Sequence, residues 1–68
     1  MSAKYKYDIT GSANGKSVVA SCVAKDTFAV LQMFKDAGIY VHTIPSRKQV
    51  HADTEIGIKS AKVIKPLK

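Results

Sequence analysis

Residues 4–24 read KYKYDITGSANGKSVVASCVA, and this stretch decides the fold class. Over 4–10, apolar side chains alternate with polar ones, which is typical of a half-buried strand. Residues 11–15 are rich in glycine and asparagine, which accept positive φ, so they predict a turn. Over 16–24 the alternation resumes with smaller side chains. The stretch therefore predicts a β-hairpin whose apolar face carries Tyr5, Tyr7, Ile9, Val18, Ala20, Cys22 and Ala24.

Residues 25–38 follow with helical spacing. Asp26 or Thr27 can accept the first amide hydrogen bonds, and Gly38 suits the left-handed residue that commonly follows a helix. The pattern predicts one amphipathic helix, whose apolar stripe comprises Val30, Met33, Phe34 and Ala37, with Ala29 and Leu31 at its margins.

Phe28 is the exception in this helix, because it projects on the polar side with Gln32 and Lys35. The favoured interpretation is that this first-turn aromatic folds back over the edge of the core. The alternative is an exposed aromatic anchor for a partner.

Two further segments complete the chain. Residues 39–44 predict a third strand that ends at Pro45, because proline cannot continue a central ladder. Residues 46–52 then form a solvated connection. A fourth strand is predicted around 54–59, extended or bulged through Ile64. The competing interpretation is a helix, which would align Ile56, Ser60, Val63 and Leu67.

The predicted fold class is α+β: a single small domain over 1–68, of the type ββαβ(β), with a mainly antiparallel sheet covered on one face by one helix. A right-handed crossover returns the third strand beside the first, giving the order 2-1-3. The fourth segment most economically pairs with the third strand. Residues 60–68 either continue that segment or form a flexible basic tail.

The pattern Y-x-Y-x-I, then G-K, then a helix ending in G-I-Y-V runs from Tyr5 to Val41. It resembles the order of elements in the small RNA-polymerase inhibitors of T7-like phages and in the repeated cytoplasmic module of type II secretion platform proteins. The resemblance rests on hydrophobic spacing, and the phage inhibitor is acidic where this chain is basic. No functional residue is therefore carried over.

Composition favours a small folded protein with polyanionic partners. Eleven basic and five acidic residues give a net charge of +6, and the stretch from Arg47 onward has six basic and two acidic residues, a net +4. Such asymmetry favours a polyanionic partner, which is nucleic acid, an acidic protein surface or, as the weakest option, an anionic membrane. The alternative is a charge that serves only solubility, with a frayed lysine tail. The start has no apolar segment of a signal peptide and no apolar run could span a bilayer, so no membrane association and a cytoplasmic location are expected. Because so short a chain builds a small core, a homodimer or docking on a partner is a further expectation.

The residues that could carry chemistry do not assemble into a site in the sequence. His42, His51 and Cys22 lack metal-ligand spacing, so no metal is expected. His42 is interpreted as a hydrogen-bonded structural histidine, and Cys22 as a small buried hydrophobe rather than a nucleophile. Residues 11–16, GSANGK, lack the spacing of a phosphate loop and lead into a strand. We expect neither an enzyme nor a cofactor.

The remaining hypothesis is a non-enzymatic small basic binding protein that contacts nucleic acid through backbone phosphates. The alternative is a protein-binding modulator or inhibitor that docks on an acidic surface of a larger enzyme, such as one that processes nucleic acid. Phe28 is the candidate aromatic anchor. The candidate contacts to nucleic acid or partner are Arg47, Lys48, His51, Lys59, Lys62 and Lys65.

Overall fold

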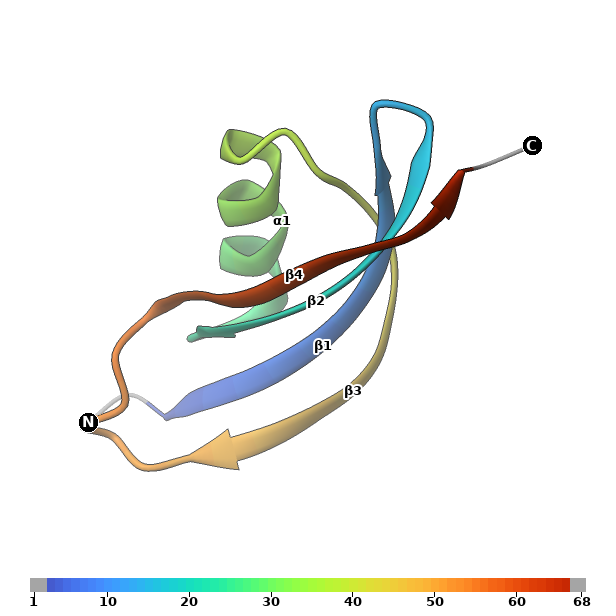
Figure 1. Ribbon diagram of the computed structural model, residues 1–68. Helices are drawn as coiled ribbons and strands as arrows, with labels where there is room; N and C mark the ends of the chain where they lie inside the picture. The colour runs from blue at the N-terminus through green and yellow to red at the C-terminus, as the bar shows by residue number, and fades with distance from the viewer. Residues whose placement is uncertain (1–2, 67–68) are drawn as a thin grey trace.

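The computed structural model describes residues 3–66 and shows a four-stranded antiparallel sheet with one helix against one of its faces (Figure 1). The predicted α+β class and the helix-covered sheet are confirmed. The elements, in chain order, are β1 (Lys4–Ala13), β2 (Lys16–Ala24), α1 (Thr27–Asp36), β3 (Tyr40–Val50) and β4 (Gly57–Pro66).

The predicted hairpin forms the two central strands, and its turn is tighter than the sequence indicated. Asn14 and Gly15 have φ of 52° and 74°, and Ala13 pairs with Lys16 across the turn. Two consecutive residues with positive φ make a type I′ turn, whose twist matches that of the flanking strands. β1 therefore continues beyond its predicted limit, with Gly11 inside it rather than in the turn, whereas β2 occupies the predicted residues 16–24.

The core lies between the inner face of the hairpin and α1. Val30 and Phe34, four residues apart on the helix, are fully buried against strand side chains. The buried cluster comprises Tyr7, Ile9, Val18, Ala20, Cys22, Ala24, Val30 and Phe34. The Tyr7 hydroxyl is buried without a hydrogen-bond partner among the described residues. Packing of its ring must therefore offset a desolvation cost of about 1–3 kcal/mol.

The helix begins and ends as its residues predict. The Asp26 carboxylate accepts the backbone N–H of Ala29 at 2.8 Å, which identifies Asp26 as the N-cap. At the other end Gly38 has φ of 83°, and the N–H of Ile39 donates to the Phe34 carbonyl at 2.8 Å. These bonds satisfy carbonyls that the helix leaves free, and they turn the chain into β3.

The prediction that the third strand ends at Pro45 is wrong. β3 continues through Pro45 to Val50, and residues 46–50 pair with the first half of β1 instead of forming a connection. Pro45 falls where the pairing register shifts between Asp8 and Thr10. Proline is tolerated there because β3 is an edge strand and the register irregularity removes the need for its N–H.

The predicted position of the fourth strand is also wrong. The sheet order is β3-β1-β2-β4, so β4 pairs with β2 and not with β3. Residues 51–56 carry the chain from one edge of the sheet to the other (Figure 1). The Lys4 ammonium donates to the Thr54 carbonyl at 2.9 Å and ties this loop to β1.

The last segment is a strand, and the helical alternative for residues 54–64 is wrong. Residues 60–66 belong to β4, so they do not form the flexible basic tail that was the alternative for residues 60–68. Residues 67 and 68 lie outside the described residues. β4 has two register shifts against β2, at Lys59 and at Ile64, as the bulged alternative allowed.

Gly11 marks the closest approach between β1 and β3. A Cβ atom at this position would lie 2.1 Å from the Tyr40 carbonyl oxygen and 3.1 Å from the Cα of Val41. Both neighbours are backbone atoms, which cannot move aside as a flexible side chain would. Glycine is therefore required here by space.

We predict that Gly11→Ala lowers the free energy of unfolding by about 1–3 kcal/mol, because the added methyl pushes β3 away from β1. Urea denaturation followed by circular dichroism measures the change. Lys6→Ala, an exposed position on the same strand, is the control and should alter stability by no more than about 0.5 kcal/mol. Equal stability of Gly11→Ala and the wild type would contradict the close approach.

Candidate nucleic-acid interface

The sheet face turned away from α1, here called the outer face, is not covered by any element of the described residues. Its members follow from strand alternation and pairing, since residues directly opposite each other in a ladder lie on the same side. They are mostly polar. The outer face carries Lys4, Lys6, Asp8, Thr10 and Ser12 of β1, Ser17, Val19, Ser21 and Val23 of β2, Tyr40, Thr43, Ser46, Lys48 and Val50 of β3, and Gly57, Ser60 and Lys62 of β4.

Cations outnumber acids on this face. Lys6 of β1 and Lys48 of β3 are direct cross-strand partners. Lys62 lies on the same face, on the other edge strand β4, where it pairs with Val19. Four lysines (Lys4, Lys6, Lys48 and Lys62) and one carboxylate give the face a net +3. In the described part of the chain, none of these lysines has a carboxylate within ion-pair distance.

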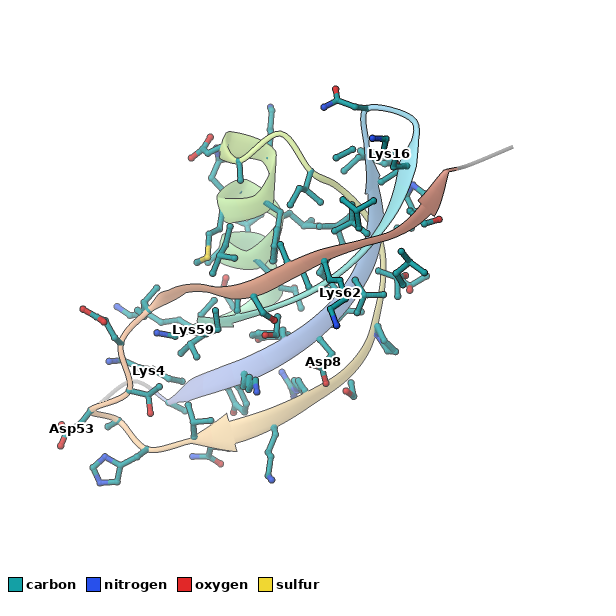
Figure 2. The ribbon with its side chains drawn as sticks, in the orientation of Figure 1. Lys4, Asp8, Lys16, Asp53, Lys59 and Lys62 are labelled. Carbon is teal, nitrogen blue, oxygen red and sulfur yellow. The ribbon has the colours of Figure 1, made fainter. Side chains whose placement is uncertain are left out.

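The helix layer contrasts with the outer face. Residues 25–38 contain two lysines and two aspartates, so this layer is neutral overall. Figure 2 shows Lys62 and Asp8 on the side of the sheet away from α1. The outer face is therefore more positive than the helix, while Lys16 and Arg47 lie on the helix side of the sheet.

Hydroxyl groups occupy the middle of the outer face. Ser46 donates to the Asp8 carboxylate at 2.8 Å, and Ser21 and Ser60 are hydrogen bonded at 2.9 Å. Thr10 and Thr43 form a third cross-strand pair of hydroxyls. These short side chains make the middle of the face polar, while Lys4, Lys6 and Lys48 lie toward one end of it and Lys62 lies on the edge strand β4.

The structure brings together only some of the residues that the sequence singled out. Lys48 and Lys62 lie on the outer face, and Lys59 occupies the bulge beside it, between Ile58 and Ser60. Lys65 pairs with Ser17 at the end of β4, and its side chain lies outside the described residues.

Arg47 does not belong to this surface. It neighbours Lys48 in the chain, but consecutive strand residues point to opposite faces. Its guanidinium lies 4.6 Å from the centroid of the Tyr5 ring on the helix side of the sheet. This cation–π contact covers the end of the core, so the expected Arg47–Lys48 basic pair is divided between the two faces.

His51 lies in the loop between β3 and β4 and faces an acid. Its Nδ1 accepts the Asp53 backbone N–H at 3.1 Å and lies 3.6 Å from the Asp53 carboxylate. The backbone and the side chain of Asp53 are therefore the contacts that the His51 ring makes. The structure does not join His51 to the lysines of the outer face.

Phe28 is 80% exposed, so the interpretation that it folds back over the core is wrong. It lies in the first turn of α1, on the opposite side of the molecule from the outer face. Leu31, one turn further along, is also exposed and lines a shallow apolar groove with Ile39, Tyr40 and Val41.

Three contributions were missed from the sequence. The signal for Lys4 and Lys6 is the alternation over 4–10, which puts them on the strand face opposite the tyrosines. The excess of basic residues from Arg47 onward favoured the C-terminal half instead. No sequence signal indicated that Tyr40 is exposed, since a tyrosine in a mostly apolar strand is expected to be in the core. The structure leaves its side chain 72% exposed.

His42 is hydrogen bonded, as expected, but exposed. Its Nε2 lies 3.2 Å from the Ser12 hydroxyl, and its ring meets the Tyr40 ring edge to face at a centroid distance of 5.3 Å. The bulge between Val41 and Thr43 places it beside Tyr40 on the outer face.

Cys22 does not lie in an accessible site. Cys22 is fully buried, and burial raises the pKa of its thiol above the usual value of 9.0. Residues 3–66 contain no cluster of three or more histidine, cysteine or acidic side chains suited to a metal ion. Within the same residues, no helix is long and apolar enough to cross a membrane.

Comparison with family models, curated proteins and solved structures finds no match to this chain.

We predict that the Cys22 thiol resists modification in the folded protein, because it is buried and its raised pKa disfavours the thiolate. Labelling by a soluble thiol reagent should be slow near neutral pH and become fast in denaturant. The raised pKa also predicts how Cys22 makes stability depend on pH. Below pH 9.0 the thiol is protonated in the folded and the unfolded chain, so Cys22 adds little pH dependence; above pH 9.0 it ionises more readily in the unfolded chain, so the free energy of unfolding falls.

Denaturation at several pH values measures this dependence, and Cys22→Ala is the control. The variant removes the thiol, so its stability should decline less steeply above pH 9.0 than that of the wild type. Fast labelling of the native protein would contradict the buried position.

Proposed function

We propose that this protein is a non-enzymatic nucleic-acid-binding protein whose outer face contacts backbone phosphates. The observation that carries the proposal is the convergence of Lys6 and Lys48 from neighbouring strands, with Lys62 on the same face and a neutral helix layer behind. Three sequence segments that are far apart thus supply cations to one surface.

The lysines are suited to phosphate for two reasons. They are exposed, and no carboxylate of the described residues neutralises them by an ion pair. Their binding to a polyanion releases condensed counterions, which makes the affinity fall steeply with salt. The cross-strand pairing of Lys6 with Lys48 also places two like charges side by side, a repulsion that an anionic ligand relieves.

The same geometry argues against reading of base edges in the major groove. The helix is the element that commonly enters that groove, and here it is neutral and lies on the other side of the sheet. The outer face carries its lysines at one end and on β4, and the short hydroxyl side chains in its middle do not reach into a groove. Contacts to the backbone with weak sequence selectivity are the expected mode.

We predict that replacing Lys6, Lys48 and Lys62 together by glutamine weakens binding to a generic oligonucleotide and reduces its salt dependence. Each lost phosphate contact lowers the slope of log affinity against log salt by about 0.7–0.9, so the slope should fall by about two to three. Fluorescence anisotropy at several salt concentrations provides both quantities.

Lys35→Gln is the matched control, because it removes one positive charge from the exposed side of α1. It should leave the slope nearly unchanged. An equal loss from Lys35→Gln and from Lys48→Gln alone would indicate dependence on net charge rather than on this surface. Absence of binding to DNA and RNA at low salt would refute the proposal.

Asp8 supplies a test in the opposite direction. It is the single carboxylate among the outer-face residues, and its hydrogen bond from Ser46 can be retained by an asparagine oxygen. We predict that Asp8→Asn raises nucleic-acid affinity about two- to fivefold at low salt, since a nearby negative charge is removed. The same anisotropy titration measures it, and a weaker affinity would mean that the carboxylate itself contacts the ligand.

A second candidate function is a modulator that docks on a larger protein, and the exposure of Phe28 favours it. Phe28 and Leu31 form an apolar strip on α1, next to the shallow groove lined by Ile39 and Val41. Exposed aromatic side chains are common anchors at protein interfaces. In this alternative the outer face meets an acidic protein surface, and a polyglutamate competitor should displace nucleic acid from the same lysines.

A further inference from the structure

We propose that the outer face binds single-stranded nucleic acid in preference to duplex, with the Tyr40 ring as a stacking surface for a base. This inference rests on the proposed function, which supplies the phosphate contacts, and adds the class of ligand. Its basis is the position of Tyr40 and His42 on the same face as the lysines.

Tyr40 is placed on the outer face by the sheet register. It pairs with Ser12, which alternates with the core-facing Ala13 and the buried Gly11. Its chain neighbours Ile39 and Val41 pack against the core cluster, so the Tyr40 side chain points to the opposite side, although Tyr40, on the edge strand β3, also borders the groove beside Leu31. With 72% of its surface exposed, the ring is not needed to complete the core.

The ring is held by a neighbour. The His42 ring meets it at 5.3 Å between centroids with an interplanar angle of 70°, and the Ser12 hydroxyl holds His42 Nε2 at 3.2 Å. This edge-to-face contact covers only part of the Tyr40 ring, and the remaining ring surface is free to stack on a base. Holding the ring in place before binding reduces the entropy lost when a base stacks on it.

The lysines lie at a distance that suits an extended strand. The Lys6–Lys48 pair and the Ser12–Tyr40 pair are separated by six residues along β1, or about 20 Å at the usual strand rise. Lys62 lies at an intermediate level, opposite Val19, which itself pairs with Thr10. A nucleic-acid strand running along the face can therefore place several phosphates near lysines while one base reaches Tyr40.

Base stacking separates the two forms of ligand. In a duplex the base faces are covered by their neighbours, so a surface tyrosine has nothing to stack on, whereas an unpaired base offers its full π-face. Phosphate contacts alone would serve both forms. A free aromatic ring on the phosphate-binding face therefore favours the single strand.

The test compares a fluorescent single strand of about 12 thymidines with a duplex of the same length by anisotropy at one moderate salt concentration. The wild type should bind the single strand at least about fivefold more tightly. Tyr40→Ala should weaken single-strand binding about tenfold and leave both the duplex affinity and the salt slope unchanged, whereas Tyr40→Phe should retain most of the affinity. Because Tyr40 is exposed, circular dichroism should show that both variants fold like the wild type.

A strand of the same length without bases is the second probe, and Tyr40→Ala should bind it as the wild type does. Equal binding of single strand and duplex, or a Tyr40→Ala variant with unchanged affinity for the thymidine strand, would overturn the stacking inference. If either result is found while replacement of Lys6, Lys48 and Lys62 still reduces the salt dependence of binding, the proposed phosphate contacts are retained and only the stacking inference fails. Loss of all salt-dependent binding would instead overturn both.

Discussion

The packing of Val30 and Phe34 onto the inner face of the β1–β2 hairpin is the contact on which the rest of the structure depends. Residues 3–66 contain one short helix, and that helix can cover one face of the sheet. Both strands of the hairpin must therefore place their core side chains on the same side. Tyr7 and Cys22 meet this requirement because they are direct cross-strand partners. The short loops at either end of α1 follow from the same contact.

That constraint also creates the outer face. Since α1 packs on the inner side, the other side of the sheet must be compatible with water, and it is built mostly from lysines and hydroxyl side chains. β2 is the exception, because Val23 is buried between its cross-strand partners Lys6 and Gly57 on this side. The face is thus a thin polar layer over the backs of the central strands. Its charge is available for a ligand because no part of the core depends on it.

Strand alternation and helix signals allowed much of this fold to be predicted. The hairpin, the Asp26 cap and the positive φ of Gly38 depend on contacts within a few residues, which local residue types specify. The prediction that the third strand ends at Pro45 was wrong because a proline interrupts a central strand but is tolerated in an edge strand. Which strand lies at the edge is a property of the whole sheet. The prediction for Phe28 was wrong because the side of α1 that carries Val30 and Phe34 packs on the sheet, which leaves Phe28 on the opposite, exposed side of the helix.

The position of β4 had a signal that was not used. Residues 18–24 are apolar or small on both faces of the strand, which is typical of a central strand rather than an edge. With β1 on one side, β2 needs a second neighbour, and β4 provides it through pairs such as Ser21–Ser60. The general tendency of consecutive strands to pair favoured β3 instead.

The sequence by itself determined the α+β class, the hairpin, the helix and the excess of positive charge, because alternation, capping and composition act locally or are simple sums. Only the tertiary structure decided which charges share a surface. It joined Lys6 to Lys48, separated Arg47 from its chain neighbour and put Tyr40 outside the core. The physical reason is register: a shift of one residue in a strand moves a side chain to the opposite face, and the bulges that set it in β3 and β4 arise from pairing between distant segments.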